Sequence, residues 1–321
     1  MATQTESARA GVAPTPVISI SPVVLPAPGR AVDLQVRISA PATGSNLPIM
    51  LFSHGQGGSN HLSSLNGYAP LTHYLAAHGF VVIQPTHLSS KSLSGDAAVA
   101  SAPGAPWFWR SRVEDMTCIL DQLEDIEAAV PTLKGRLDHS RVAVVGHSMG
   151  GHTASVLLGA QLTEADGTVV SLAEPRIKAG VLLAAPGNGG ADLNPTMAER
   201  VPFLRHPSFA HMTTPALVVV GDKDVSPHLT VRGADWHADP YALSPSPKSL
   251  LTLFEAEHGL GGISGYDAAE TTDENPERVA LVARLTGAYL RTALYPENTS
   301  WQLASQALLS NSNPLGRIES K

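Results

Sequence analysis

The fold that this sequence predicts is decided by the stretch Arg141–Gly151, which reads RVAVVGHSMGG. Its apolar first half is typical of a buried β-strand, and the helix-forming run Thr153–Leu158 follows it. Between the two lies the pattern G-x-S-x-G, which places a serine on a sharp turn between a strand and a helix. The glycines allow strand and helix to approach each other closely. The stretch therefore predicts that Ser148 presents its hydroxyl above the end of a sheet, as a nucleophile.

Short apolar runs occur on both sides of this turn, and helical stretches lie between most of them. The runs are Ile49–Phe52, Phe80–Ile83, Val142–Val145, Gly180–Leu183, Ala216–Val220 and Leu250–Phe254. Continuous apolar runs of this length are typical of parallel strands that helices cover on both faces. A further run, Val32–Ile38, alternates apolar and polar residues, as a half-buried antiparallel strand does. The sequence thus predicts an α/β chain with a mostly parallel, doubly wound sheet flanked by helices.

Three of the helices are predicted from signals at their ends. The residues that mark them are Pro70–His78 with Gly79 as a stop, Ser111 with Glu114 as a capping box, and Asn275, Pro276 and Glu277 at the start of the last helix. Two stretches, roughly Ser89–Arg110 and Pro186–Thr214, are too long for ordinary connections. They are expected to be functional loops or a small cap.

Length and composition indicate one large globular domain. The 321 residues are 43% hydrophobic and show no internal repeat or change in composition, so residues 17–321 are expected to form a single domain after a loose segment 1–16. The formal net charge of −7 argues against nucleic acid and anionic membranes as partners. Neither a signal peptide nor a membrane-spanning run is visible, which predicts a cytoplasmic location without membrane insertion. The oligomeric state stays open.

A nucleophilic serine needs a base and an acid that orients the base. In a sheet of this kind they follow the serine along the chain, each just after a strand. The run Ala216–Val220 leads into Asp222 and Asp224, and the run Leu250–Phe254 leads into His258. Asp224 is favoured as the acid because the fourth residue of a G-x-x-D turn curls over the sheet edge, whereas Asp222 is placed to cap the turn through backbone N–H groups.

Neither a metal nor an organic cofactor is predicted. Cys118 is the single cysteine, which excludes an intrachain disulfide and a site built from several thiolates. The other histidines show no spacing typical of metal ligands and are interpreted as surface or structural residues. Examples are His139, His206, His211 and His237.

The loop Ser53–Gly58 (SHGQGG) follows the strand Ile49–Phe52. In hydrolases with a nucleophilic serine on a strand–helix turn, a loop at this position donates a backbone N–H to the oxyanion. The second donor is expected to be the amide of Met149, directly after the nucleophile. In this order, the motifs HGQGG, GHSMGG, GDKD and AEHG resemble the α/β-hydrolase superfamily over roughly residues 32–294. They look most like the branch that holds chlorophyllases, platelet-activating-factor-acetylhydrolase-like lipases and bacterial polyester hydrolases. The resemblance implies an α/β-hydrolase fold with a small cap or none, and main-chain amides of Gln56 and Met149 as oxyanion donors.

These residues together predict a serine carboxylic-ester hydrolase that forms an acyl-enzyme on Ser148 and acts on a small-molecule ester. Two alternatives remain: an amidase or peptidase on the same triad, and a catalytically silent ligand-binding protein with a hydrolase scaffold. For the substrate pocket, the candidates are Trp107, Phe108 and Trp109, which concentrate aromatic area in a chain that is only 5% aromatic. The alternative for these three rings is that they anchor their loop on the core.

Overall fold

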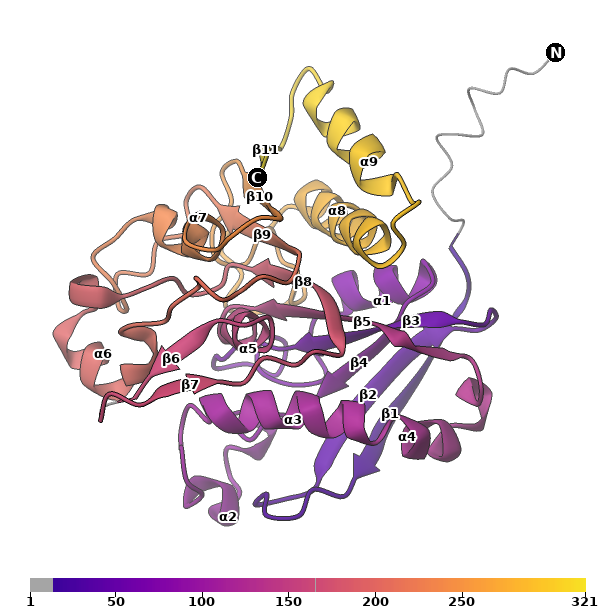
Figure 1. Cartoon of the computed structure of the whole chain (residues 1–321), viewed down its shortest axis with the longest axis horizontal. Coiled ribbons are helices and arrows are strands. Elements are labelled where there is room, and N and C mark those ends of the chain that lie inside the picture. The colour runs from indigo at the N-terminus through magenta and orange to yellow at the C-terminus, as the bar shows by residue number, and fades with distance from the viewer. Residues whose placement is uncertain (1–13, 165) are drawn as a thin grey trace.

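The computed structural model describes residues 14–164 and 166–321 (Figure 1). Within these residues, nine strands form one sheet in the order β1-β2-β4-β3-β5-β8-β9-β10-β11. The neighbours from β4 to β10 pair in parallel, whereas β1 with β2, β2 with β4, and β10 with β11 pair antiparallel. The prediction of a mostly parallel sheet is confirmed, and the architecture is that of an α/β-hydrolase fold.

Each continuous apolar run of the sequence overlaps one of the strands that pair in parallel, and most residues of these strands are buried. The strands are β1 (Val17–Leu25), β2 (Leu34–Pro41), β3 (Leu47–Ser53), β4 (Val81–Pro85), β5 (Leu137–His147), β8 (Ile177–Leu183), β9 (Ala216–Gly221), β10 (Lys248–Leu253) and β11 (Gly316–Ser320). A separate hairpin consists of β6 (Gln161–Thr163) and β7 (Val169–Ser171). Every residue of β3, β4, β9 and β10 is buried.

Helices cover both faces of the sheet (Figure 1). Apolar residues of α1 (Ala69–Ala77) and α8 (Pro276–Leu294) belong to the core cluster on one face. Residues of α3 (Trp109–Asp121), α4 (Leu123–Ala129) and α5 (Met149–Leu157) belong to the cluster on the other face. The remaining helices are α2 (Ala97–Ala100), α6 (Pro195–Arg200), α7 (Asp239–Ala242) and α9 (Ser300–Leu309). This three-layer arrangement leaves the carboxyl ends of the parallel strands free to carry a site.

The start of α3 differs from the sequence prediction. The prediction that a capping box at Ser111 starts the helix is wrong, because α3 begins two residues earlier, at Trp109. Phe108 precedes it with φ 50°, and its side chain is buried beside Leu88 and Val99. Packing of Phe108, and not a polar cap, therefore fixes where this helix begins. For the last predicted helix, Asn275 accepts the Arg278 N–H at 2.9 Å, as an N-cap residue does.

Most of the segment 1–16, which the sequence predicts to be loose, lies outside the described residues. Two of its last residues bond to the body of the chain: the Thr15 N–H donates to the Ala77 carbonyl at 2.8 Å, and the Pro16 carbonyl accepts the Ala42 N–H at 2.7 Å. The chain is thus tied to α1 and β2 just before β1 begins.

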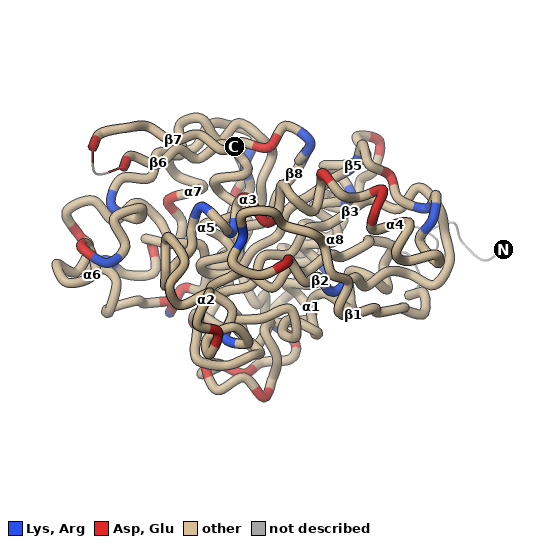
Figure 2. The backbone as a smooth tube through the Cα atoms, turned by 90° about the horizontal axis from the view of Figure 1, so that it is seen from below, with Lys and Arg blue, Asp and Glu red and all other residues tan. Residues whose placement is uncertain are grey.

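Acidic and basic residues are interspersed along the backbone (Figure 2). Among the described residues, no helix combines the length and the apolar composition that crossing a membrane requires. The longest helix, α8, instead buries one face on the sheet and carries charged residues such as Glu277 and Arg291 near its ends.

Candidate active site

Ser148 is the single residue between the end of β5 and the start of α5, and its backbone has φ 55° and ψ −121°. A positive φ is strained for a residue with a Cβ. Two hydrogen bonds hold the turn: the Ser148 N–H donates to the Leu183 carbonyl at 2.9 Å, and the His152 N–H donates to the Ser148 carbonyl at 3.1 Å. A Cβ on Gly146 would lie 2.0 Å from the Gly150 carbonyl oxygen, so this close strand–helix approach requires glycine.

The structure brings Ser148, His258 and Asp224 together at the carboxyl ends of β5, β10 and β9. His258 Nε2 lies 2.8 Å from Ser148 Oγ, and His258 Nδ1 lies 3.0 and 3.1 Å from the two Asp224 carboxylate oxygens. The Asp224 side chain is fully buried, whereas that of His258 is 37% exposed. The Asp224 carboxylate is therefore sealed from water, while the His258 imidazole can be reached from solvent.

The charges within this group are set by the contacts of Asp224. Burial alone would raise the pKa of the Asp224 carboxyl, but the neighbouring imidazoles of His258 and His237 outweigh it and hold that pKa below its usual range. Burial also opposes protonation of His258, yet the Asp224 carboxylate raises the pKa of His258 above its ordinary value. Asp224 is consequently an anion that is paired with the base.

Asp222, the other acid of the same turn, has a different contact. Its Oδ1 accepts the Glu255 N–H at 2.7 Å and so joins the turn after β9 to the turn after β10. It makes no hydrogen bond to His258 within the described part of the chain. Of the two carboxylates, only Asp224 faces the imidazole.

The loop Ser53–Gly58 lies directly beside the Ser148 turn. A Cβ on Gly150 would lie 2.0 Å from the Ser53 carbonyl oxygen, so the start of α5 packs against this loop. The Gly55 N–H already donates to the Tyr68 hydroxyl at 2.9 Å. The main-chain N–H of Gln56, in contrast, has no acceptor among the described residues. Met149 is the first residue of α5, where the N–H has no partner within the helix. Both amides are thus available to a bound group.

Tyr68 and His147 form a bridge between this loop and the loop of His258. His147 Nε2 lies 2.8 Å from the His258 carbonyl, which can only accept, so Nε2 carries a proton. Burial lowers the pKa of His147 to about 3, so the ring is neutral and its Nδ1 is an acceptor. The Tyr68 hydroxyl accepts the Gly55 N–H and faces two acceptors, His147 Nδ1 at 2.9 Å and the Leu62 carbonyl at 3.1 Å, which share its proton.

Tyr68→Phe tests this bridge, because phenylalanine fills the same space but leaves the Gly55 N–H and His147 Nδ1 without a partner. We expect the free energy of unfolding to fall by about 1–3 kcal/mol. Urea denaturation measures it, and an unchanged slope shows that the change is one of stability. Tyr74→Phe is the control, since the Tyr74 hydroxyl has no hydrogen bond within the described residues. Equal losses in the two variants would contradict the bridge.

A buried polar network also holds the start of the loop Ser53–Gly58 in place. Arg112 of α3 is fully buried and donates to the His54 carbonyl and, at 3.2 Å, to Thr153 Oγ1 of α5. Asp115 accepts from Arg30 Nε and from His87 Nδ1, each at 2.8 Å, and His87 Nε2 lies 2.9 Å from Ser53 Oγ. These bonds hold the end of β3 against α3 and α5.

The three aromatic residues that the sequence suggests for a pocket, Trp107, Phe108 and Trp109, do not pack together. Phe108 packs with Leu88 and Val99, away from the other two rings. Trp107 and Trp109 both contact Phe203, with ring centroids 6.4 and 6.2 Å apart. Trp109 also helps to line a pocket of about 260 Å³, together with Leu162, Thr163, Glu164, Pro202 and Phe203. The two tryptophans thus join the two long stretches of the sequence.

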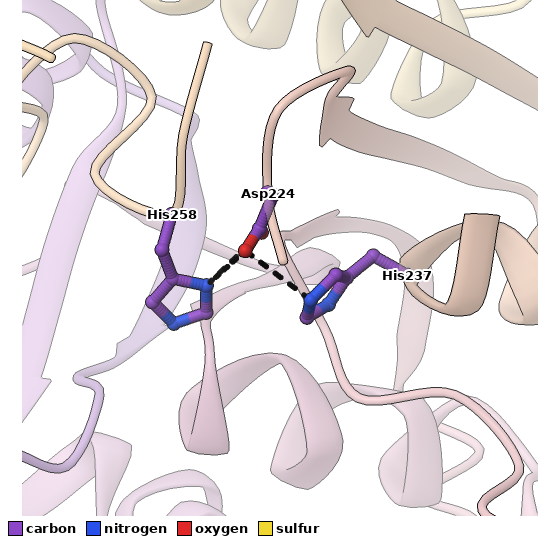
Figure 3. Close-up of side chains that lie close together, drawn as sticks. All are labelled: Asp224, His237 and His258. Atoms are coloured by element: carbon purple, nitrogen blue, oxygen red, sulfur yellow. Dashed lines mark hydrogen bonds and ion pairs between the residues drawn. The ribbon is translucent and has the colours of Figure 1, made fainter. Parts of the chain in front are cut away.

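His237 approaches Asp224 from the side opposite His258 (Figure 3). It lies in the short 3₁₀ helix Ala234–Ala238, and its Nε2 is 3.3 Å from Asp224 Oδ1. Asp224, His237 and His258 can each offer one ligand atom, and these three atoms lie within 4.8 Å of one another, which is close enough for a metal ion. Asp224 already accepts the His258 Nδ1–H, however, so a metal would have to displace this hydrogen bond.

The sequence does not mark Tyr68, Arg112, His147 or His237 as parts of the site. His147 lies within the G-x-S-x-G pattern, but its partner Tyr68 is 79 residues away. His237, interpreted as a surface or structural residue, follows Asp224 without any spacing that marks a motif. Only the folded chain reveals these contacts, because each joins segments that are distant in the sequence.

Comparison with known proteins gives one family and several relatives. A family model described as Chlorophyllase matches residues 10–172. The chain is 30% identical over 142 residues to the platelet-activating factor acetylhydrolase of Cavia porcellus (35% of this chain, 31% of the relative). It is 26% identical over 145 residues to that of Bos taurus (35% and 32%). It is 29% identical over 150 residues to Chlorophyllase-1 of Arabidopsis thaliana (46% and 40%). Each match thus spans less than half of the relative's length.

The family match covers three of the five residues of the candidate site. Residues 10–172 contain Gln56, Ser148 and Met149 but end before Asp224 and His258. The assignment of the acid and the base therefore depends on the geometry at the ends of β9 and β10.

Proposed function

The chain belongs to the chlorophyllase family, and from this premise we propose that it is a serine carboxylic-ester hydrolase that acts on a small-molecule ester. One observation carries the proposal: a continuous line of hydrogen bonds runs from Ser148 Oγ through His258 to Asp224, with distances of 2.8 and 3.0 Å. It starts at a strained turn that is followed directly by Met149 and that packs against the loop carrying Gln56. This is the arrangement that acyl transfer to serine requires.

In the first half of the reaction, Ser148 Oγ attacks the ester carbonyl carbon while its proton passes to His258 Nε2. The carbonyl oxygen becomes an oxyanion, and the amides of Gln56 and Met149 donate hydrogen bonds to it. When the oxyanion collapses, the bond to the alcohol oxygen breaks. His258 returns its proton to that oxygen, so an alcohol leaves and the acyl group remains on Ser148.

In the second half, His258 Nε2 takes a proton from water as the water oxygen attacks the acyl carbon. Collapse of the second oxyanion breaks the bond to Ser148 Oγ, which regains a proton from His258, and the acid is released. Throughout, Asp224 holds Nδ1 of His258 protonated and stabilises the imidazolium. The groups of the chain and one water molecule complete every step, so the proposal includes no metal or organic cofactor.

Labelling with a fluorophosphonate probe tests the proposal, because the probe reacts with an activated serine. We expect one label for each chain, located at Ser148 by mass spectrometry of its peptides. A chain that takes up no label would be a silent binding protein with a hydrolase scaffold.

Rates on a matched ester and anilide then separate an esterase from an amidase or peptidase, and we expect the ester to be cleaved much faster.

Two substitutions at Gln56 test the oxyanion loop. The Gln56 side chain donates from Nε2 to the Pro106 carbonyl at 3.3 Å, which supports the main-chain N–H as the group that would bind the oxyanion. Gln56→Ala keeps that amide and should change kcat little. Gln56→Pro removes the N–H and should lower kcat by about 10² or more.

The measurement is kcat on one ester, with circular dichroism to verify that both variants are folded. Gln56→Ala serves as the matched control for the loss of the side chain. Equal damage from both substitutions would mean that the side chain contacts the substrate or that the donor lies elsewhere.

A further inference from the structure

A carboxylate from a distant part of the chain binds the end of the loop Ser53–Gly58. Glu270 lies in the segment 259–275, which connects His258 to α8. Its Oε1 accepts the Ser59 N–H at 2.8 Å, and its Oε2 accepts the Ser59 hydroxyl at 2.6 Å. Because Ser59 directly follows the loop, both oxygens of one carboxylate are used to hold the point where the loop ends.

The loop backbone also passes close to this carboxylate. A Cβ on Gly57 would lie 3.0 Å from Glu270 Oε1 and 2.4 Å from the Leu62 side chain, so a side chain at this position would displace one of the two. Gly57 directly follows Gln56, whose main-chain N–H has no acceptor among the described residues. The carboxylate therefore contacts the loop next to the proposed oxyanion donor.

The loop is held at its start and at its end by different parts of the chain. At the start, Arg112 donates to the His54 carbonyl. At the end, Glu270 accepts both hydrogens of Ser59. No hydrogen bond within the described residues fixes the direction of the Gln56 N–H itself, so that direction depends on these two attachments.

Glu270 is itself attached to a firmly held segment. Asp273, three residues later, accepts the N–H groups of Glu257 and Gly261, each at 2.9 Å. It also pairs with Arg278 of α8 at 3.1 Å, and its side chain is almost fully buried. The segment that follows the proposed base is thus fixed at both ends, and Glu270 can hold the loop in place from it.

We propose that Glu270 is a positioning residue that holds the Gln56 N–H at the place where the oxyanion forms. An oxyanion donor must lie at hydrogen-bond distance from the oxygen in the transition state, so a loop that opens at Ser59 loses this contact. The segment 259–275 would then determine the position of the base and of one oxyanion donor together. The inference rests on the proposed function, because it assigns Gln56 the same role.

Hydrogen exchange followed by mass spectrometry tests the hold on the loop without a substrate. In Glu270→Ala the Ser59 N–H loses its acceptor, and we expect the amides of residues 55–59 to exchange at least about tenfold faster than in the wild type. Glu274→Ala is the matched control, because this exposed carboxylate of the same segment accepts no hydrogen bond among the described residues. Unchanged exchange of the loop in Glu270→Ala would overturn the proposal.

Steady-state kinetics on an ester test the effect on the reaction. We expect kcat of Glu270→Ala to fall by about tenfold or more while KM changes less than about twofold, because the amide is needed only when the oxyanion develops. Glu270→Gln should stay within about threefold of wild type, since its amide can accept the Ser59 N–H and donate to Ser59 Oγ. An unchanged kcat in Glu270→Ala would overturn the positioning role.

The same substitution in the Gln56→Pro background separates positioning from a merely structural role. Gln56→Pro removes the N–H whose place Glu270 is proposed to control. Adding Glu270→Ala should therefore lower kcat by less than about threefold further. Two losses that multiply in full would show that Glu270 acts independently of this amide, which would overturn the proposal.

Failure of the proposed function gives a different result. If the wild-type chain cleaves no ester and takes up no fluorophosphonate, the proposed function fails and the positioning role fails with it. Hydrogen exchange still decides whether Glu270 holds the loop. An active wild type whose Glu270→Ala variant keeps full kcat contradicts the positioning role alone.

Discussion

Ser148→Ala is expected to lower kcat for ester hydrolysis by more than about 10³-fold while the chain stays folded. The substitution removes one oxygen atom and with it the attacking group, and members of a triad act as a unit. Both backbone hydrogen bonds of the turn, to Leu183 and from His152, involve main-chain atoms and are retained. Steady-state rates on an ester, together with fluorophosphonate labelling, measure the loss.

Ser155→Ala is the matched control for this experiment. Ser155 lies in the same helix, α5, and is buried, and within the described residues its hydroxyl donates only to the His152 carbonyl, at 2.8 Å. Its loss should leave kcat within a few-fold. If Ser148→Ala retained more than about a hundredth of the wild-type kcat, the nucleophile would be another residue.

Asp224→Asn is expected to lower kcat by roughly 10³ to 10⁴, the scale given by the corresponding substitution in trypsin. The amide NH₂ of asparagine can donate to His258 Nδ1, which moves the ring proton to Nε2. A ring protonated there cannot accept the proton of Ser148. The Asp224 carboxylate is sealed from water, so no solvent replaces its charge.

Asp222→Asn provides the comparison within the same turn and should stay within about tenfold of wild type. Asparagine still offers a carbonyl oxygen to the Glu255 N–H that Asp222 accepts. The measurement is kcat for both variants under identical conditions. The opposite order of effects would assign the role to Asp222, and losses below tenfold in both would point to an acid on another strand.

The sequence predicts the centre of this fold well and its edges poorly. Runs such as Ile49–Phe52 identify buried parallel strands because every residue of β3 is covered. The edge strand β11 is polar, and β1 is largely exposed on one side, so neither has the apolar pattern on which that prediction depends. The start of α3 is misplaced for a related reason: burial of Phe108 outweighs the local capping signal at Ser111.

Some residues of the candidate site can be predicted from the sequence, and others cannot. The elements with a local signature, the turn at Ser148 and the two segments that carry Asp224 and His258, can be identified from short motifs, because strand ends impose their order. The residues that hold these elements in place carry no such signature. Tyr68 contacts Gly55 and His147, and His237 lies beside Asp224, so their positions become apparent only when separate segments of the chain are in contact.

The backbone at Ser148 has a consequence for engineering. A residue with a Cβ at φ 55° and ψ −121° costs the folded state about 1–3 kcal/mol, a cost from which glycine is largely exempt. Selection for heat tolerance alone would therefore reward the loss of the proposed nucleophile. Directed evolution of this chain should screen for turnover in every round, and codon 148 is the first to sequence in any stabilised but inactive descendant.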